Sequence, residues 1–583
     1  MNDYTAPTTA IMRALGATGL DDVLALGAFD GLDVDGVADI VAGFGQLAGE
    51  VIAPSDAFGD AFGATLDQET GSVTVADAVG KAFDQWVHGG WPGFTAPAEF
   101  GGGGMPVAVG SALDEMFSSA NLALSLNPML SQGAIHLLEA WGTPEQQQRY
   151  LPALVTGRFT GTMNLTEPEA GSDVGALRTK AEPLDDGRWS ITGTKIFITW
   201  GEHDLTENII HLVLARTPGA PPGTRGISTF LVPAKVWGDD DSIGDRNGVT
   251  CIGLEHKLGI HSSPTCVLEF DGAIGEMIGP EHGGMAAMFT MMNSARLSVG
   301  LEGIGVGERA YQQAVAYAGE RRQGRAVGAD GDGPSPIIEH PDVRRMLLRM
   351  ASGNEAMRLL LYRTAVANDL AHHADDEVAA EGARALADLL TPLAKAWSTD
   401  EGVRLASVAV QVFGGVGYVE ETGVAQRYRD ARIAPIYEGT NGIQAIDLVT
   451  RKVRRDGGTA LAALVADLRA DVDAAADLVA DAVGPVRAAL DALDAATAWL
   501  VAADTPDAVL AAASPYLDLA SLAVCGGLYA RAVAWSHAHE SAEVASGVAG
   551  RFAFYAHERV SVAPALMGTI TAGAAGLDAA FLP

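Results

Sequence analysis

The pattern of apolar positions separates a helical first part of the chain from a β-rich second part. Up to about residue 159, apolar and Ala-containing segments such as 113–130 predict helices, and Gly-rich clusters such as 101–104 interrupt them as loops. From 160 to 282, short runs rich in Ile, Val and Thr, such as 209–214, are bounded by Pro, Gly or Asn and predict strands. Several such strands separated by turn signals predict an antiparallel barrel or sandwich.

Helical spacing of apolar residues returns in the second half of the chain. It runs from about 283 to 455, and again through an Ala- and Asp-rich tail after 456. Gly484-Pro485 is expected to kink or break the first run of that tail. We therefore predict a mainly α protein with a central β-barrel domain. Its predicted domains are a helical domain with an N-terminal extension at 1–159, a β-barrel at 160–282, a helical bundle at 283–455 and an extra C-terminal helical domain at 456–583.

This order of elements argues against a dinucleotide-binding fold. Such folds alternate strands and helices, whereas here whole helical and β regions follow one another. Gly414-Gly415-Val416-Gly417 looks like a phosphate-binding loop, but it follows a helical segment at 405–413 and not a strand. A Rossmann interpretation of these glycines is therefore disfavoured.

Composition and charge narrow the class of protein further. The 583 residues are 48% hydrophobic and 19% charged, so a large core is expected and global disorder is not. The net charge of -35 argues against binding along a nucleic-acid backbone, which needs a basic face. A phosphate-bearing ligand remains compatible, because a few arginines and helix N-termini can hold it.

The cysteines and the N-terminus predict a compartment. Cys251, Cys266 and Cys525 form no CxxC pair, so neither a disulfide framework nor a zinc site is expected, and a reducing cytoplasm fits. No signal peptide is evident, and no run of about eighteen apolar residues is free enough of charge, Pro and Gly to predict stable membrane insertion. We expect no metal site either: His537 and His539 would face different sides of a helix.

Five motifs occur in an order that is specific in combination. They are the stretches Met163–Asp173, Lys195–Thr199, Arg321–Arg325, Gln411–Gly415 and Tyr437–Thr440. This series resembles the acyl-CoA dehydrogenase family over about 51–453. The start at 4–7, the stretch 258–265 and the long tail are similar to its large bacterial branch, which includes methylmercaptopropionyl-CoA dehydrogenase-like enzymes.

The resemblance implies an enzyme and its cofactor. The family's fold is helical, then β, then helical, here with an extra helical domain. Its members use FAD to convert an acyl-CoA to a trans-2-enoyl-CoA and pass the electrons to an electron-transfer flavoprotein.

Glu438 is the candidate base for the α-proton of the substrate. A carboxylate is a weak base in water, but in an apolar slot its pKa rises because desolvation disfavours the charged form. Some relatives carry the base on an earlier helix, and there Asn293-Ser294-Ala295-Arg296 offers no carboxylate, which favours Glu438. Taken alone, Glu438 would be interpreted as a solvated loop glutamate.

The remaining site residues are carried over from the family one by one. Those matching flavin contacts are Met163, Leu165, Thr166, Phe197, Thr199, Arg321, Gln323, Gln411, Gly414, Gly415 and Thr440. Those matching contacts to the acyl-CoA are Ser172, Asn293, Arg296, Tyr437 and Gly439. Phe197 replaces a tryptophan that is usual in the family and keeps an aromatic face.

The resemblance also predicts a homodimer. In the family, the residues matching Arg321, Gln323 and Gln411 reach the cofactor of a neighbouring subunit, as do the two glycines at 414 and 415. The tail is expected to pack on the preceding helical domain and to cover the surface that other members use to form tetramers.

Two alternatives to the dehydrogenase remain open. The first is an acyl-CoA oxidase that returns electrons to oxygen. The second is a DNA-associated flavoprotein of the same fold, which the scarcity of Lys and Arg after Asp456 disfavours. Purely structural roles are also open for single residues. Met163 and Phe197 could be ordinary core residues, and Arg296 could be the partner in a surface ion pair.

Overall fold

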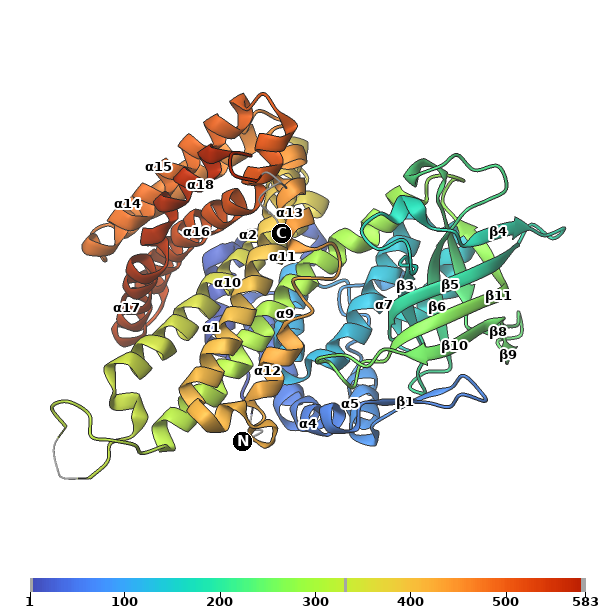
Figure 1. Ribbon diagram of the computed structural model, residues 1–583, viewed down its shortest axis with the longest axis horizontal. Coiled ribbons are helices and arrows are strands. Elements are labelled where there is room, and N and C mark those ends of the chain that lie inside the picture. Colours follow the sequence, from blue (N-terminus) through green and yellow to red (C-terminus); the bar gives the residue numbers. More distant parts are fainter. Residues whose placement is uncertain (1–3, 330–332, 578–583) are drawn as a thin grey trace.

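The first part of the molecule is helical (Figure 1). The computed structural model describes residues 4–329 and 333–577; the outermost residues of the first and last predicted domains lie outside these ranges. The helices here are α1 (Thr8–Thr18), α2 (Leu20–Leu24), α3 (Val34–Leu47), α4 (Ala53–Phe62), α5 (Asp77–His88), α6 (Val107–Ala120), α7 (Leu122–Trp141) and α8 (Pro144–Val155). The sequence analysis missed one feature, a hairpin of β1 (Ala64–Leu66) and β2 (Val73–Val75).

The β-rich part forms one large sheet beside the helices (Figure 1). The strands of this sheet are β3 (Phe159–Asn164), β4 (Lys180–Pro183), β5 (Trp189–Thr199), β6 (Asn208–Ala215), β7 (Ser228–Pro233), β10 (Val249–Leu254) and β11 (Thr265–Ile278). Two further strands, β8 (Lys235–Trp237) and β9 (Ile243–Arg246), pair with each other in a small separate sheet. The order is β3-β6-β7-β11-β5-β4, with β10 also paired to β11. The pairing of β3 with β6 is parallel and the other pairs are antiparallel.

The long strand β11 organises this sheet. Its first part pairs with β5, from Thr265 opposite Thr199 to Gly275 opposite Trp189, and its last three residues pair with β7. Two irregularities in the β11–β5 register bend the strand between these partners. Among the described residues the strands form an open path, so a β-sheet domain is confirmed and a closed barrel is not.

Three long helices form the centre of the molecule. The long helices are α9 (Gly284–Glu320), α10 (Pro341–His373) and α11 (Glu377–Phe413). Two short helices follow, α12 (Val424–Ala431) and α13 (Asn441–Asp447). Helices α9 and α11 approach each other so closely at Gly303 that an added Cβ would lie 2.3 Å from the Ser398 carbonyl oxygen. Only glycine fits there without a shift of the backbone. Helices α6 and α7 pack on α9, so the first part of the chain completes this bundle.

The tail forms a second group of helices. They are α14 (Thr459–Ala475), α15 (Ala480–Ala502), α16 (Pro506–His539), α17 (Ala542–Glu558) and α18 (Leu566–Ala572). Helix α16 packs on α10, α11 and α13, which confirms that the tail covers the preceding helical region (Figure 1). The expected break at Gly484-Pro485 was wrong: α15 continues through Pro485, and the chain leaves the helix instead at Val479, where φ is -143°.

Two described helical stretches are long and apolar enough to cross a membrane when judged by length and composition alone. One is Val34–Phe62, where α3, a π-helical turn at 48–52 and α4 run on as one helix, and the other is Pro506–His539. The second is the core helix α16, and 67% of its most apolar window is buried inside the protein. Buried core helices pass the same test, so this observation is weak evidence for a membrane protein.

Candidate active site

Glu438 lies in the loop between α12 and α13, in an unusual backbone conformation. Its φ is +56° and that of Gly439 is +83°, so two successive residues are left-handed. Such a conformation is unfavourable for a residue with a side chain and persists only where neighbours hold it. Thr440 then caps α13, its hydroxyl accepting a hydrogen bond from the Ile443 N–H at 3.3 Å.

The surroundings of the Glu438 carboxyl favour its protonated form more than water does. Burial raises the pKa of Glu438 to about 7, and the nearby charges of Arg296 and Lys395 limit that rise. One of its oxygens, Oε2, is buried and has no hydrogen-bond partner among the described residues. A carboxyl that titrates near neutral pH can accept a proton from a bound molecule.

Glu302 and Lys395, two buried residues that the sequence analysis missed, flank this loop. The Tyr437 hydroxyl donates to the carboxylate of Glu302 on α9. From α11, the ammonium of Lys395 donates to the Gly439 carbonyl at 3.0 Å and to the Asn441 side chain at 2.9 Å. Burial raises the pKa of Glu302 to about 8 and lowers that of Lys395 to about 8.

Arg296 and Asn293 lie one turn apart on α9. Arg296 is buried and donates to the Asn293 side-chain oxygen at 3.2 Å, while Asn293 is exposed. The negative charge of Glu438 favours the charged form of Arg296. Arg296 therefore lies close to the loop that carries Glu438, as predicted.

Several buried polar atoms around this loop have no hydrogen-bond partner in the part of the chain that the structure describes. They are Glu438 Oε2, Glu302 Oε1, Arg296 Nε and Gln444 Oε1. Buried polar atoms are normally hydrogen-bonded, so a cluster of unpaired ones indicates a place that a ligand or water completes. The catalytic and acyl-binding candidates Arg296, Tyr437, Glu438 and Gly439 are thus brought together.

A second group of predicted residues lies on the sheet. Met163 is the second-last residue of β3, Leu165 and Thr166 follow this strand, and Phe197 and Thr199 lie in β5. The Thr166 carbonyl accepts from the Ile196 N–H at 2.9 Å, which joins the two segments. Phe197 is 57% exposed, so it is not ordinary core, and its φ of +58° is again left-handed. Ser172 lies in an exposed loop after β3.

A third group lies at the other end of the bundle. Arg321 and Gln323 follow α9, and Gln411, Gly414 and Gly415 lie at the end of α11. Stacking of Tyr317 on Phe413, with ring centroids 4.2 Å apart, holds these two helix ends together. Along α9, Arg321 follows Arg296 by roughly 38 Å at 1.5 Å per residue. Within a single copy of the chain, these residues at the ends of α9 and α11 therefore lie far from Glu438.

The third group presents open backbone and polar side chains. Gly414 has a φ of +65°, and added Cβ atoms at Gly414 and Gly415 would meet nothing within 4 Å. The Arg321 guanidinium is exposed and donates to the neighbouring Gln323 side-chain oxygen at 3.2 Å. An exposed arginine beside accessible backbone suits a phosphate-bearing ligand.

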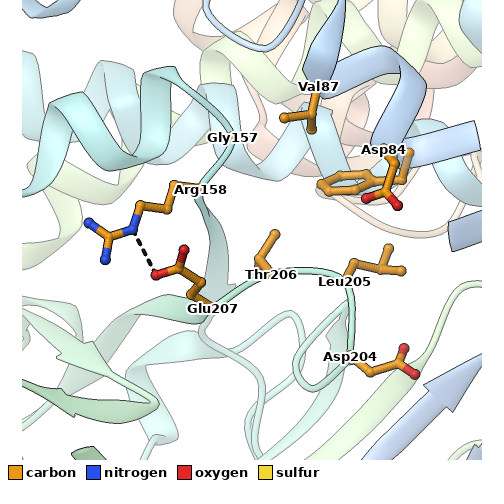
Figure 2. A pocket seen from close by; sticks show the side chains of 9 residues that line it. Asp84, Val87, Gly157, Arg158, Asp204, Leu205, Thr206 and Glu207 are labelled. Carbon is orange, nitrogen blue, oxygen red and sulfur yellow. Dashed lines mark hydrogen bonds and ion pairs between the residues drawn. The ribbon is translucent and has the colours of Figure 1, made fainter. Parts of the chain in front are cut away.

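A hollow of about 320 Å³ lies away from all three groups, between α5 and the loop before β6 (Figure 2). Its one cation, Arg158, is already paired with Glu207 at 2.8 Å and with Asp241 at 2.7 Å. None of the predicted site residues lines it. It is therefore not the candidate active site.

Comparison with known families defines the class of protein. Three models of acyl-CoA dehydrogenase domains match this chain, the N-terminal domain at 64–158, the middle domain at 162–273 and the C-terminal domain at 282–453. A fourth, described as acetyl-CoA dehydrogenase C-terminal like, matches 462–579. The chain belongs to the acyl-CoA dehydrogenase family and is an enzyme of that class.

Curated relatives support this membership over most of the chain. The chain is 49% identical to 3-methylmercaptopropionyl-CoA dehydrogenase of Ruegeria pomeroyi over 456 residues, which cover 78% of this chain and 77% of the relative. It is 37% identical to the broad-specificity linear acyl-CoA dehydrogenase FadE5 of Mycobacterium tuberculosis over 472 residues, covering 79% and 76%. The resemblance to the large bacterial branch is thereby confirmed.

Solved structures share the fold. Butyryl-CoA dehydrogenase of Megasphaera elsdenii is 26% identical, with a TM-score of 0.57 over 71% of this chain and 96% of that one. Caenorhabditis elegans ACDH-11, solved in complex with C11-CoA, has a TM-score of 0.76 over 94% and 91% at 20% identity, which shows the fold alone. FAD is the cofactor of this family, as the motifs predicted.

Proposed function

We propose that this enzyme dehydrogenates an acyl-CoA thioester between its α- and β-carbons and releases a trans-2-enoyl-CoA. The observation that carries the proposal is the Glu438 carboxyl, which titrates near pH 7 beside buried polar atoms that have no partner. Glu438 takes the α-proton, and bound FAD supplies the acceptor for the β-hydride. An electron-transfer flavoprotein is the proposed acceptor of the electrons afterwards, by analogy with the family.

Acidification of the α-proton is the second task of the site. The backbone N–H of Glu438 is the proposed donor to the thioester carbonyl, since charge that develops on this oxygen is stabilised by preorganised donors. Tyr437 and Gly439 would border the acyl group on either side of the base. Asn293 and Ser172 would contact the CoA part of the substrate, and Arg296 would bind the substrate close to the loop that carries Glu438.

The residues present fit the cofactor. Phe197 offers an exposed aromatic face, and the segment Met163 to Thr166 would border the polar edge of the flavin, with Thr199 near its hydride-accepting side. Thr440 is the remaining contact proposed from the base loop. The open backbone at Gly414 and Gly415 supports a close approach of the adenosine half.

A homodimer is part of this proposal. Arg321, Gln323 and Gln411 lie at the far end of α9 and α11 from Glu438, so they would complete the cofactor site of a second copy. We also retain the division into domains at 159/160, 282/283 and 455/456, with a barrel-like β domain. The three free thiols support a reducing compartment such as the cytoplasm.

The test is the substitution Glu438→Gln. Purified wild-type and variant enzymes are mixed with an acyl-CoA panel without oxygen, and the flavin absorbance is followed. The wild type is expected to bleach with at least one acyl-CoA, whereas Glu438→Gln retains its flavin and stays oxidised. Glu421→Gln, an exposed change in the neighbouring loop, serves as the control and should bleach like the wild type. Bleaching of Glu438→Gln at the wild-type rate would refute the assignment.

A further inference from the structure

Lys395 is a buried ammonium group that the proposed reaction does not yet use. It lies in the middle of α11, in contact with the loop that carries Glu438. Its ammonium donates to the Gly439 carbonyl at 3.0 Å and to the Asn441 Oδ1 at 2.9 Å. A buried cation costs free energy unless such contacts compensate it, so its placement here calls for an explanation.

The two acceptors of Lys395 lie at the end of the left-handed part of the loop and just after it. Gly439 immediately follows Glu438, and Asn441 begins α13. The Asn441 side chain is itself tied to α11, because its Nδ2 donates to the Ala396 carbonyl at 2.9 Å and to the Thr399 hydroxyl at 3.0 Å. Helix α11 therefore anchors the loop at the second left-handed residue, Gly439, and again two residues later at Asn441.

Other charged groups face Lys395 from the elements around it. Glu302 and Arg296 act on it from α9, Glu438 from the loop and Asp400 from α11 itself. Among these charges, the carboxyls of Glu302 and Glu438 favour the charged ammonium most, and Arg296 opposes it. Lys395 in turn favours the ionised form of Glu438.

We propose that Lys395 is a positioning residue for the catalytic base: its ammonium holds the Gly439 carbonyl and the Asn441 side chain, and so fixes the loop that orients the Glu438 carboxyl. The proposal rests on the dehydrogenase function proposed above. It assigns Lys395 no contact with the substrate. A misplacement of a reacting group by about 1 Å can cost around 100-fold in rate, so the loss of such an anchor is measurable.

The experiment compares Lys395→Met with Lys452→Met, a lysine outside the site that pairs with Asp388. Both variants are purified with FAD, and flavin reduction by the best acyl-CoA is followed by rapid mixing from pH 5.5 to 9. Lys395→Met is expected to reduce its flavin about 10- to 100-fold more slowly at saturating substrate, with the substrate concentration for half-maximal rate little changed. The pH midpoint should also rise, because a charge that favours ionised Glu438 is lost. Lys452→Met should match the wild type.

A second variant keeps the proposal testable if Lys395→Met fails to fold or to retain flavin. Asn441→Ala leaves Lys395 in place and removes one of its two acceptors. It is expected to slow flavin reduction about 10-fold. A wild-type rate and pH profile in Lys395→Met, or in Asn441→Ala where only that variant folds, would overturn the proposal. Failure of the wild type to react with any acyl-CoA, or full activity of Glu438→Gln, would instead overturn the function itself.

Discussion

At the scale of single residues, the site depends on charges that burial has shifted away from their ordinary ionisation. Burial raises the pKa of the Glu438 carboxyl to about 7 and that of the Glu302 carboxyl to about 8, and it lowers the pKa of the Lys395 ammonium to about 8. Such shifts concentrate at functional sites because acid–base chemistry needs groups that titrate near the working pH.

The ionisation of Glu438 predicts a pH dependence for the reaction. Its ionised form accepts the α-proton, so the rate should rise with pH through a midpoint of about 7 and then level off. One pH unit below that midpoint, the rate should be roughly a tenth of the plateau value at high pH. The second-order rate constant of flavin reduction at low acyl-CoA concentration measures this, because it reports the free enzyme. Arg296→Gln removes a charge that lowers the pKa of Glu438, and its midpoint should therefore move upward. A midpoint near 4.5 in the wild type would contradict the prediction.

The sequence predicted the loop but not the residues that hold it. Tyr437-Glu438-Gly439-Thr440 could be recognised as a continuous motif. Glu302 and Lys395 lie 136 and 43 positions before Glu438 in chain numbering, inside long apolar helices, and only folding brings them to it. A single polar position in such a helix does not indicate which loop it will contact.

At the scale of elements, the periodicity of apolar residues located most helices and strands, and its failures have physical causes. The hairpin of β1 and β2 was missed because each strand has only three residues, too few for an alternating pattern. The break at Pro485 was wrong because that residue lies six positions into α15, where the remaining hydrogen bonds and the packing of the buried face sustain the helix. Closure of the sheet depends on strand register, which no local pattern specifies.

Contact between the tail and the bundle includes a buried ion pair. Arg559, just after α17, donates to the Glu401 carboxylate on α11 at 3.0 Å, and Glu401 is fully buried. We expect Arg559→Met to destabilise the protein by roughly 3 kcal/mol, because it leaves a buried carboxylate with less compensation. Calorimetry and urea unfolding of the FAD-loaded enzyme measure this.

A matched control for Arg559 exists within the tail. Arg487 pairs with Asp473 at 2.7 Å, but both side chains are largely exposed. Exposed pairs contribute about 0–1 kcal/mol, so Arg487→Met should change stability by no more than that. Equal losses in the two variants would show that burial of the pair is not what matters at Arg559.

At the scale of the whole molecule, the residues proposed for the site lie at separate places in one chain. The loop that carries Glu438 and the residues on β3 and β5 are proposed to serve one site, and the ends of α9 and α11 are proposed to serve the site of a second copy. The first helix also joins distant regions: Arg13 on α1 pairs with Glu540 after α16 at 2.8 Å and contacts Glu355 on α10. The tail thus packs against the bundle and leaves the helix ends near Arg321 and Gly414 accessible, which is where a second copy is proposed to bind.

Mixed dimers test whether two copies share their sites. Glu438→Gln lacks the base but keeps Arg321, whereas Arg321→Ala keeps the base but lacks the proposed phosphate contact. If each site combines Glu438 of one copy with Arg321 of the other, a dimer of one variant with the other contains one intact site and one doubly defective site. Co-expression with two different affinity tags isolates that dimer, and its flavin reduction should reach about half of the wild-type amplitude at the wild-type rate. Sites built within one chain would instead give only the slow reaction of Arg321→Ala, because every site would then carry one defect.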